Sequence, residues 1–250
     1  MQGSSKYAKY PGYSRAMSAL PEDLPKVGPK TLKFYDSYFS YIQQGDDAQH
    51  EVMPVLIQSD GSKGIEVGTT AEKRVGQRVF LKKLCVAIKA FYNTGLNSNY
   101  YIPGTPNGQT CRILIVMDTQ TNGATMSATD LLDQSDTGST SVANVPSIQH
   151  YHMAASKRFR VLYDKVVQIN ADAPGFQSTT NAISTKYHHI KIELPLKDTI
   201  IYADENENGT INGIRSNNLY LITTTDKQDP LNGYEPYVSW RVNSRVFFTD

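Results

Sequence analysis

Thr110-Cys-Arg-Ile-Leu-Ile-Val-Met-Asp-Thr-Gln-Thr-Asn-Gly123 is the stretch that decides the fold. Its centre, Ile113 to Met117, is continuously apolar and too short for a helix of ordinary length. Such a run between turn-forming residues predicts a strand that is buried on both faces. Asp118 ends the run, and Asn122-Gly123 indicates a turn because both residue types tolerate positive φ. Taken alone, the stretch is most simply an ordinary core strand with no chemistry.

A short helix is expected directly after this strand. Ser127-Ala-Thr-Asp130 has the spacing of a capping box, in which the serine hydroxyl and the acidic side chain satisfy backbone donors at a helix start.

The rest of the chain predicts more strands and little helix. Alternating apolar residues and turn-rich gaps favour strands at residues 34–42, 79–91, 156–169, 187–196, 199–203, 218–225 and 237–249. With the central strand this predicts an all-β protein, a single jelly-roll β-sandwich of about eight antiparallel strands with long loops. The residues expected to fill the space between its two sheets are Ile113, Ile115, Phe159, Val161, Ile190, Ile192, Trp240 and Val242.

Three strands carry further expectations. Phe159, Val161, Tyr163, Val167 and Ile169 alternate within 156–169 and are expected on one face. Lys82-Lys83 interrupts the apolar pattern of 79–91, so that strand needs a bulge or a solvated side. Pro195 indicates a sheet edge or a strand end.

Charge is distributed unevenly along the 250 residues, although the formal net charge is only +1. Residues 1–33 carry six cations against two acids, and residues 72–91 carry six against one. Residues 118–136 and 198–209 each carry four acids and no cation. We therefore expect a flexible basic arm over residues 1–33, a folded domain over residues 34–250, and two surfaces of different charge.

Several function classes are not supported by any motif. The two cysteines, Cys85 and Cys111, have no ligand spacing and are expected to be buried free thiols. No signal peptide and no apolar run of roughly 18 residues is present, so we expect a soluble, intracellularly made protein without membrane insertion.

Catalytic and metal-binding patterns are also weak. His150-x-His152 and His188-His189 lack completing ligands for zinc, and the half calcium-loop pattern at 204–209 has Arg215 where a bidentate glutamate belongs. No nucleophile, phosphate-loop or paired-carboxylate motif occurs. We expect no enzyme activity, no metal and no cofactor.

Five segments, taken in order, resemble capsid proteins of small circular Rep-encoding single-stranded DNA viruses, the group related to geminiviruses and circoviruses. The central stretch matches the family's run at Arg112, Val116, Asp118, Gln120 and Gly123. The other matching segments are Gly68-Thr69 with Arg74-x-Gly76 and Lys82-Lys83-Leu84, Lys157 to Leu162, Tyr187 to Leu221, and the terminal Ser244 to Asp250. The resemblance covers residues from about 65 onward.

The resemblance implies a capsid subunit that assembles with copies of itself into a small icosahedral shell around circular single-stranded DNA. It further implies an unknown host receptor, and a location in the virion and, during assembly, in the host nucleus or cytoplasm. The family's arm is usually densely basic, whereas residues 1–33 are only mildly so. An alternative is a lectin-like or receptor-binding β-sandwich module, for which the tyrosines of Asn99-Tyr-Tyr-Ile102 would suit sugar binding.

In the capsid interpretation, two basic regions would neutralise phosphates without reading bases. The arm also mixes cations with tyrosines, which suits a flexible single strand. The expected nucleic-acid contacts are Lys6, Lys9, Arg15, Lys73, Arg74, Arg78, Lys82 and Lys83.

Overall fold

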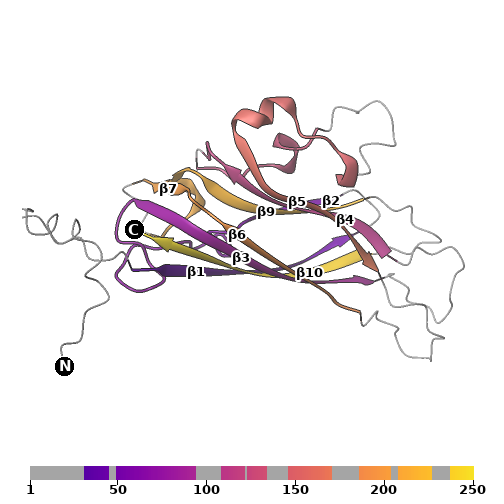
Figure 1. Cartoon of the computed structure of the whole chain (residues 1–250), viewed down its shortest axis with the longest axis horizontal. Coiled ribbons are helices and arrows are strands. Elements are labelled where there is room, and N and C mark those ends of the chain that lie inside the picture. The colour runs from indigo at the N-terminus through magenta and orange to yellow at the C-terminus, as the bar shows by residue number, and fades with distance from the viewer. Residues whose placement is uncertain are drawn as a thin grey trace, which may run out of the picture. The chain divides into compact units, whose positions relative to one another are not determined.

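Two antiparallel sheets lie face to face in the computed structural model (Figure 1). The structure describes residues 31–44, 49–93, 108–121, 123–133, 146–170, 186–203, 208–226 and 237–250. Its strands are β1 (Lys33–Gln44), β2 (Gln49–Pro54), β3 (Arg78–Asn93), β4 (Gly108–Asp118), β5 (Phe159–Asn170), β6 (His188–Pro195), β7 (Thr199–Tyr202), β8 (Ile214–Ser216), β9 (Asn218–Thr225) and β10 (Tyr237–Thr249). Helical structure within the described residues is limited to the 3₁₀ turns η1 (Ala128–Asp130), η2 (Pro146–Ile148), η3 (Met153–Lys157) and η4 (Ile211–Gly213).

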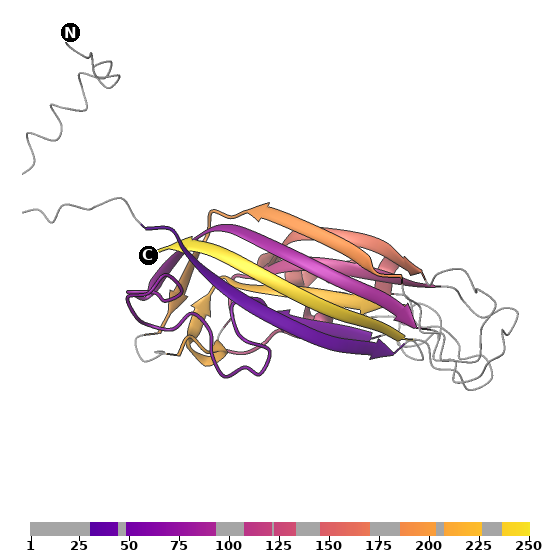
Figure 2. The same ribbon diagram turned by 90° about the horizontal axis from the view of Figure 1, so that it is seen from below.

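The strand order is that of a single jelly roll. In the larger sheet β1 pairs with β10 and β10 pairs with β3. The other edge of β3 pairs with β7 at residues 78–80 and with β6 at residues 83–90, and β8 pairs with β7. The smaller sheet has the strand order β2-β9-β4-β5. Figure 2 shows β10 between β1 and β3, with β6 beyond. Successive strands lie in opposite sheets, except that β4 and β5 are both in the smaller sheet and β6, β7 and β8 are all in the larger one, an arrangement that matches the two Greek keys of this fold. The predicted all-β jelly roll is therefore confirmed.

The strand count differs from the prediction. Strands β2 and β8 were not expected, which makes ten strands among the described residues instead of about eight. Strand β2 was missed because its sequence, Gln-His-Glu-Val-Met-Pro, has no clear alternation, and β8 because it spans only three residues.

The main core lies between the sheets and contains most of the predicted residues. Ile113, Ile115, Ile192, Trp240 and Val242 are all buried there, and Ile190 packs against them. The indole of Trp240 stacks on Tyr41 at 6.4 Å between ring centroids. Burying this much apolar surface is the dominant favourable term in folding.

Strand β4 is buried on both faces, as its continuous apolar run predicted. Ile113, Ile115 and Met117 face the core between the sheets. Leu114 and Val116 face the other way, into a second cluster beneath the connector 119–158, whose described residues lie over the smaller sheet (Figure 1). That connector begins with the expected short helix, since Ser127 and Asp130 form both hydrogen bonds of the capping box.

The expectation that Phe159 and Val161 fill the space between the sheets is wrong. Both lie in the second cluster, beneath the connector. Ile115 pairs with Tyr163 but Val116 pairs with Val161, so Leu162 is an extra residue on β5. A β-bulge of this kind reverses the facing of the residues on one side of it, which a simple alternation rule misses.

The other two local predictions are confirmed. Phe247 pairs with Lys83 and Phe248 pairs with Leu81, which makes Lys82 the extra residue of a bulge in β3. Pro195 ends β6, which among the described strands pairs with β3 alone and so forms part of the sheet edge.

Several predictions fall outside the described residues. These are Lys6, Lys9 and Arg15 of the proposed arm, the tyrosines of 99–102, and most of the loop at 204–209. Within the predicted arm, Lys33 already belongs to β1 and is buried. No helix in the described part of the chain is long and apolar enough to cross a membrane.

Candidate nucleic-acid interface

On the outer face of the larger sheet, charged side chains lie in rows of residues that pair directly across neighbouring strands. On four neighbouring strands, pairing aligns Ser40, Arg241, Lys89 and His189 in one row and Tyr38, Asn243, Ala87 and Lys191 in the next. The third row is Asp36, Arg245, Cys85 and Glu193, and the fourth is Phe34, Phe247, Lys83 and Pro195. We call these four rows the basic face.

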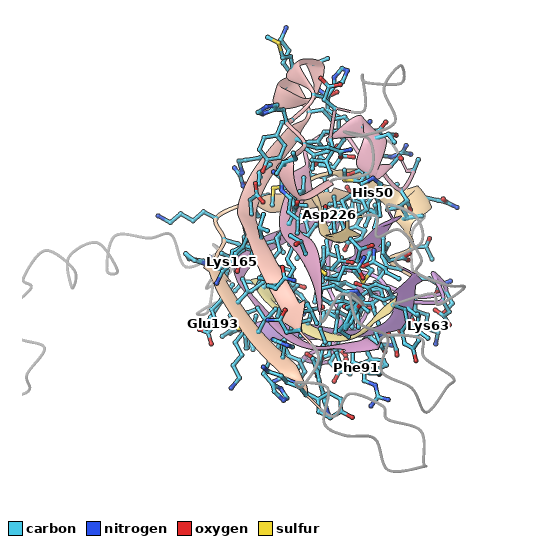
Figure 3. All side chains as sticks on the ribbon, turned by 90° about the vertical axis from the view of Figure 1, so that its right-hand side faces the viewer. His50, Lys63, Phe91, Lys165, Glu193 and Asp226 are labelled. Atoms are coloured by element: carbon cyan, nitrogen blue, oxygen red, sulfur yellow. The ribbon has the colours of Figure 1, made fainter. Side chains whose placement is uncertain are left out.

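The basic face has five cations and two acids, a net charge of +3. Its strands lie side by side in Figure 2, and Figure 3 shows Glu193 and Phe91 on this outer side of the larger sheet. A surface with one dominant charge attracts and steers ligands of the opposite sign.

Two of the five cations are paired with the two acids. Lys83 Nζ lies 2.6 Å from Glu193 Oε2, and this carboxylate holds the pKa of Lys83 above its ordinary value. Arg245 donates two hydrogen bonds, of 2.7 and 2.6 Å, to the two carboxylate oxygens of Asp36. Both pairs are solvent-exposed, so they contribute little to stability.

The remaining cations, Lys89, Lys191 and Arg241, face no acid in any row. Arg241 lies directly opposite Lys89, which itself lies opposite His189. Within the described part of the chain, Arg241 and Lys191 have no ion-pair partner, and the Lys89 ammonium lies 3.7 Å from the centre of the Tyr187 ring. Like charges directly opposite one another on a sheet are unfavourable, so this row would be stabilised by an anion.

The outer face of the smaller sheet is different because the connector covers it. Leu131 and Leu132 pack there on Leu114, Val116 and Tyr220. Arg112, on that same face, is held by two hydrogen bonds to Asp164 of 2.8 and 2.7 Å and a third to the Gln149 carbonyl. The arginine and hydrophobic residues of the central motif therefore have structural partners in this protein.

The prediction that Arg74 contacts phosphate is wrong, because this residue is buried. Its side chain is 2 % exposed, donates to the carbonyls of Ile65 and Gly76, and stacks on the Tyr202 ring at 4.2 Å. Burial lowers the pKa of this guanidinium. An arginine committed to the interior cannot reach a phosphate without unfolding its surroundings.

The other predicted cations are scattered. Lys73 pairs with Glu66 at 2.9 Å, and Arg78 is exposed at the start of β3, opposite Ile201. Lys82 is the exposed bulge residue, and only Lys83 belongs to the basic face. Charge clustering along the sequence thus grouped side chains that the fold separates.

Four cations of the basic face were missing from the predicted set: Lys89, Lys191, Arg241 and Arg245. A usable signal exists in the sequence, since Lys191 alternates with Ile190 and Ile192, and Arg241 alternates with Trp240 and Val242. Cations out of phase with the core residues of a strand must lie on its outer face. Their gathering on one surface depends on which strands become neighbours, and the sequence does not reveal that.

No grouping of three or more His, Cys, Asp or Glu side chains suited to a metal ion occurs among the residues that the structure describes. His188 instead contacts the backbone of Asn170 through Nε2, at 3.1 Å from the amide nitrogen.

Comparison with known proteins identifies no family. No known protein family matches the sequence, and no curated protein matches it either. Among solved structures, the VP1 protein of trichodysplasia spinulosa-associated polyomavirus, in complex with sialylated precision glycooligomers, is similar at 11% identity and a TM-score of 0.27. That alignment covers 89% of this chain and 95% of the VP1 chain. The likeness is too distant to bear on function, and the fold assignment rests on the strand order above.

Proposed function

We propose that this protein is a viral capsid subunit, whose copies assemble into a small icosahedral shell that encloses single-stranded DNA. The observation that carries the proposal is the asymmetry of the sandwich: one outer face is covered by the connector, whereas no described segment covers the other, which bears a net charge of +3. Jelly rolls occur in capsid and lectin domains alike. An open polybasic face suits a polyanion such as nucleic acid, and the ordered motif resemblance points the same way.

The basic face would act by neutralising phosphates. Each phosphate contacted by a lysine or arginine releases a counterion, which favours binding without regard to base sequence. Subunit contacts would come from the sheet edges and loops, repeated by symmetry until the shell closes. No catalytic step is part of this function.

Sizing of the purified full chain tests the proposal directly. We expect uniform spherical particles in electron microscopy and sedimentation, with ~60 copies in the smallest closed icosahedral arrangement. Circular single-stranded DNA supplied during assembly should become resistant to nuclease. Only monomers or small oligomers over a range of salt and pH would contradict the proposal and favour the lectin-like module, which glycan binding by those small species would then test.

A further inference from the structure

A shallow hollow lies in the middle of the basic face. Its volume is about 240 Å³, and its floor is formed by the small side chains of Cys85 and Ala87 on β3. Asn243 and Arg245 of β10 form one wall, and Lys191 and Glu193 of β6 form the other. The hollow exists because two small residues on β3 stand between longer side chains on both neighbouring strands.

The uncompensated cations lie at one end of this hollow. Lys89 is two residues beyond Ala87 on the same face of β3, Arg241 is directly opposite Lys89, and Lys191 is directly opposite Ala87. In an antiparallel pair, diagonal neighbours such as Lys89 and Lys191 are about 7–8 Å apart. These three cations lie on three neighbouring strands at that end of the hollow, and none of them has an ion-pair partner among the described residues.

The hollow itself is lined by both donors and acceptors. The Asn243 amide offers both, the Lys191 ammonium donates, and the carboxylates of Glu193 and Asp36 accept. The two acids and two cations of the lining balance in charge, so the hollow itself has no net charge that would favour a simple anion, whereas a nucleobase has an edge of donors and acceptors and an apolar face. Tyr38, which is 52% exposed, follows Asn243 in the same cross-strand row and offers a ring on which a neighbouring base can stack.

We propose that this hollow binds one nucleotide of a single strand of DNA, with its base over Cys85 and Ala87 and its phosphate at Lys89, Lys191 and Arg241. The inference rests on the proposed packaging function and narrows it to a site. Bases of a duplex are paired and stacked, so they cannot enter a surface hollow without being flipped out. The site therefore selects unpaired DNA, although the cations alone would hold either form.

The chain contains a natural probe of the hollow. Cys85 is partly exposed on its floor, so the expectation that both thiols are buried is wrong for this residue. Cys111, the other cysteine, is fully buried, and that burial raises its thiol pKa. An uncharged alkylating reagent on the native full chain should thus modify Cys85 alone, which mass spectrometry can follow. A single-stranded oligothymidine at nine times its Kd should slow this modification about tenfold, since only the unoccupied tenth of the sites reacts.

Variants then separate the two parts of the site. Ala87→Met fills the hollow at an exposed position and should remove the preference for single-stranded over duplex DNA while leaving the salt dependence of binding unchanged. Arg241→Gln combined with Lys89→Gln should weaken binding to both forms. Lys165→Gln is the matched control, because this exposed lysine lies on β5 of the other sheet (Figure 3) and should change neither property.

The outcomes are distinguishable from failure of the packaging function. If the oligonucleotide binds but the rate of Cys85 modification is unchanged, the hollow is not the binding site, whereas the proposed packaging function is unaffected. Protection of Cys85 by particle assembly alone, without DNA, would also overturn it, because the hollow would then be a subunit contact. If no DNA binds at all, both the nucleotide site and the packaging function are contradicted. If DNA slows Cys85 modification in the wild type but not in Ala87→Met, the site is established.

Discussion

Asp118 and Arg158 form a two-pronged ion pair that closes the connector over the smaller sheet. Arg158 Nε donates to Asp118 Oδ1 at 3.0 Å, and Nη2 donates to Oδ2 at 2.7 Å. Asp118 is the last residue of β4, and Arg158 directly precedes β5. The pair therefore joins the two ends of a forty-residue excursion, and the Thr119 amide adds a hydrogen bond to the Arg158 carbonyl at 2.9 Å.

Breaking this pair from the arginine side should be strongly destabilising. The Asp118 side chain is 0% exposed, so Arg158→Ala leaves a buried carboxylate without its cation, which costs about 3–5 kcal/mol. Arg245→Ala is the matched control, because Arg245 grips Asp36 with the same geometry but both side chains are nearly half exposed. That change should cost at most about 1 kcal/mol. Urea unfolding measures both free energies, and equal costs would contradict the assigned role of burial.

The pair of Arg112 and Asp164 should make stability fall in acid. Hydrogen bonds from Arg112, and one from the Tyr151 hydroxyl, hold the pKa of Asp164 below its ordinary value. A carboxyl whose pKa is lower in the folded state contributes stability that is complete above the unfolded value of about 3.9 and is lost as pH falls through the folded value. The difference in unfolding free energy between the wild type and Asp164→Asn should therefore shrink below about pH 4. A difference that stays constant down to acid pH would argue against this linkage.

Trp240 offers a test of the core with two substitutions. Its side chain is fully buried, and within the described part of the chain its indole Nε1 has no hydrogen-bond acceptor. Trp240→Ala leaves a cavity and should cost about 3–5 kcal/mol. Trp240→Phe keeps much of the apolar volume and removes an unpaired donor, so it should cost clearly less. Thermal and urea unfolding give both values, and a phenylalanine variant as unstable as the alanine variant would show that the donor is satisfied.

The periodicity of the sequence predicted the strands well, and it failed where a single extra residue changes the pattern. The continuous apolar run of Ile113–Met117 identified a strand buried on both faces, because no alternation means no solvated side. For strand β5 the prediction of which residues face the core was partly wrong. Its alternation is regular in the sequence, but the extra residue Leu162 turns Phe159 and Val161 toward the connector.

The candidate site was harder to predict because it depends on which strands are neighbours. Arg241 and Lys89 are far apart in the sequence, and only the insertion of β10 between β1 and β3 brings them together. Local charge density instead pointed to Arg74, which the fold buries. A cation close to others in the sequence can serve the interior, and sequence spacing does not distinguish the two uses.

Gly123 and Gly61 should respond differently to the same substitution. Both have positive φ, of +72° and +73°, so an alanine at either position is strained by about 1–2 kcal/mol. At Gly123 the added Cβ would also lie 2.8 Å from the Asn212 carbonyl oxygen, whereas at Gly61 nothing lies within 4 Å. Gly123→Ala should therefore be the more destabilising in urea unfolding. Equal losses of unfolding free energy would mean that the backbone at Asn212 moves away from the added Cβ with no energetic penalty.

The salt dependence of DNA binding decides between the basic face and the cations that cluster in the sequence. Each phosphate contact with a single strand contributes about −0.7 to the slope of log K against log salt. Replacing Lys89, Lys191 and Arg241 with Gln should therefore flatten the slope by about 2. Titrations of single-stranded DNA at several salt concentrations measure this change.

The matched variant for that experiment carries Lys73→Gln and Arg78→Gln. Both cations lie off the basic face, and Lys73 is paired with Glu66. These changes should leave the slope almost unaltered, and neither variant should change the preference among sequences, because phosphate contacts carry no base information. Arg74→Gln is unsuitable as a binding probe because Arg74 is buried and its loss should unfold its surroundings. If the slope followed Lys73 and Arg78 instead, the DNA would bind at the start of β3, and the like charges of Arg241 and Lys89 would have to be balanced by another subunit.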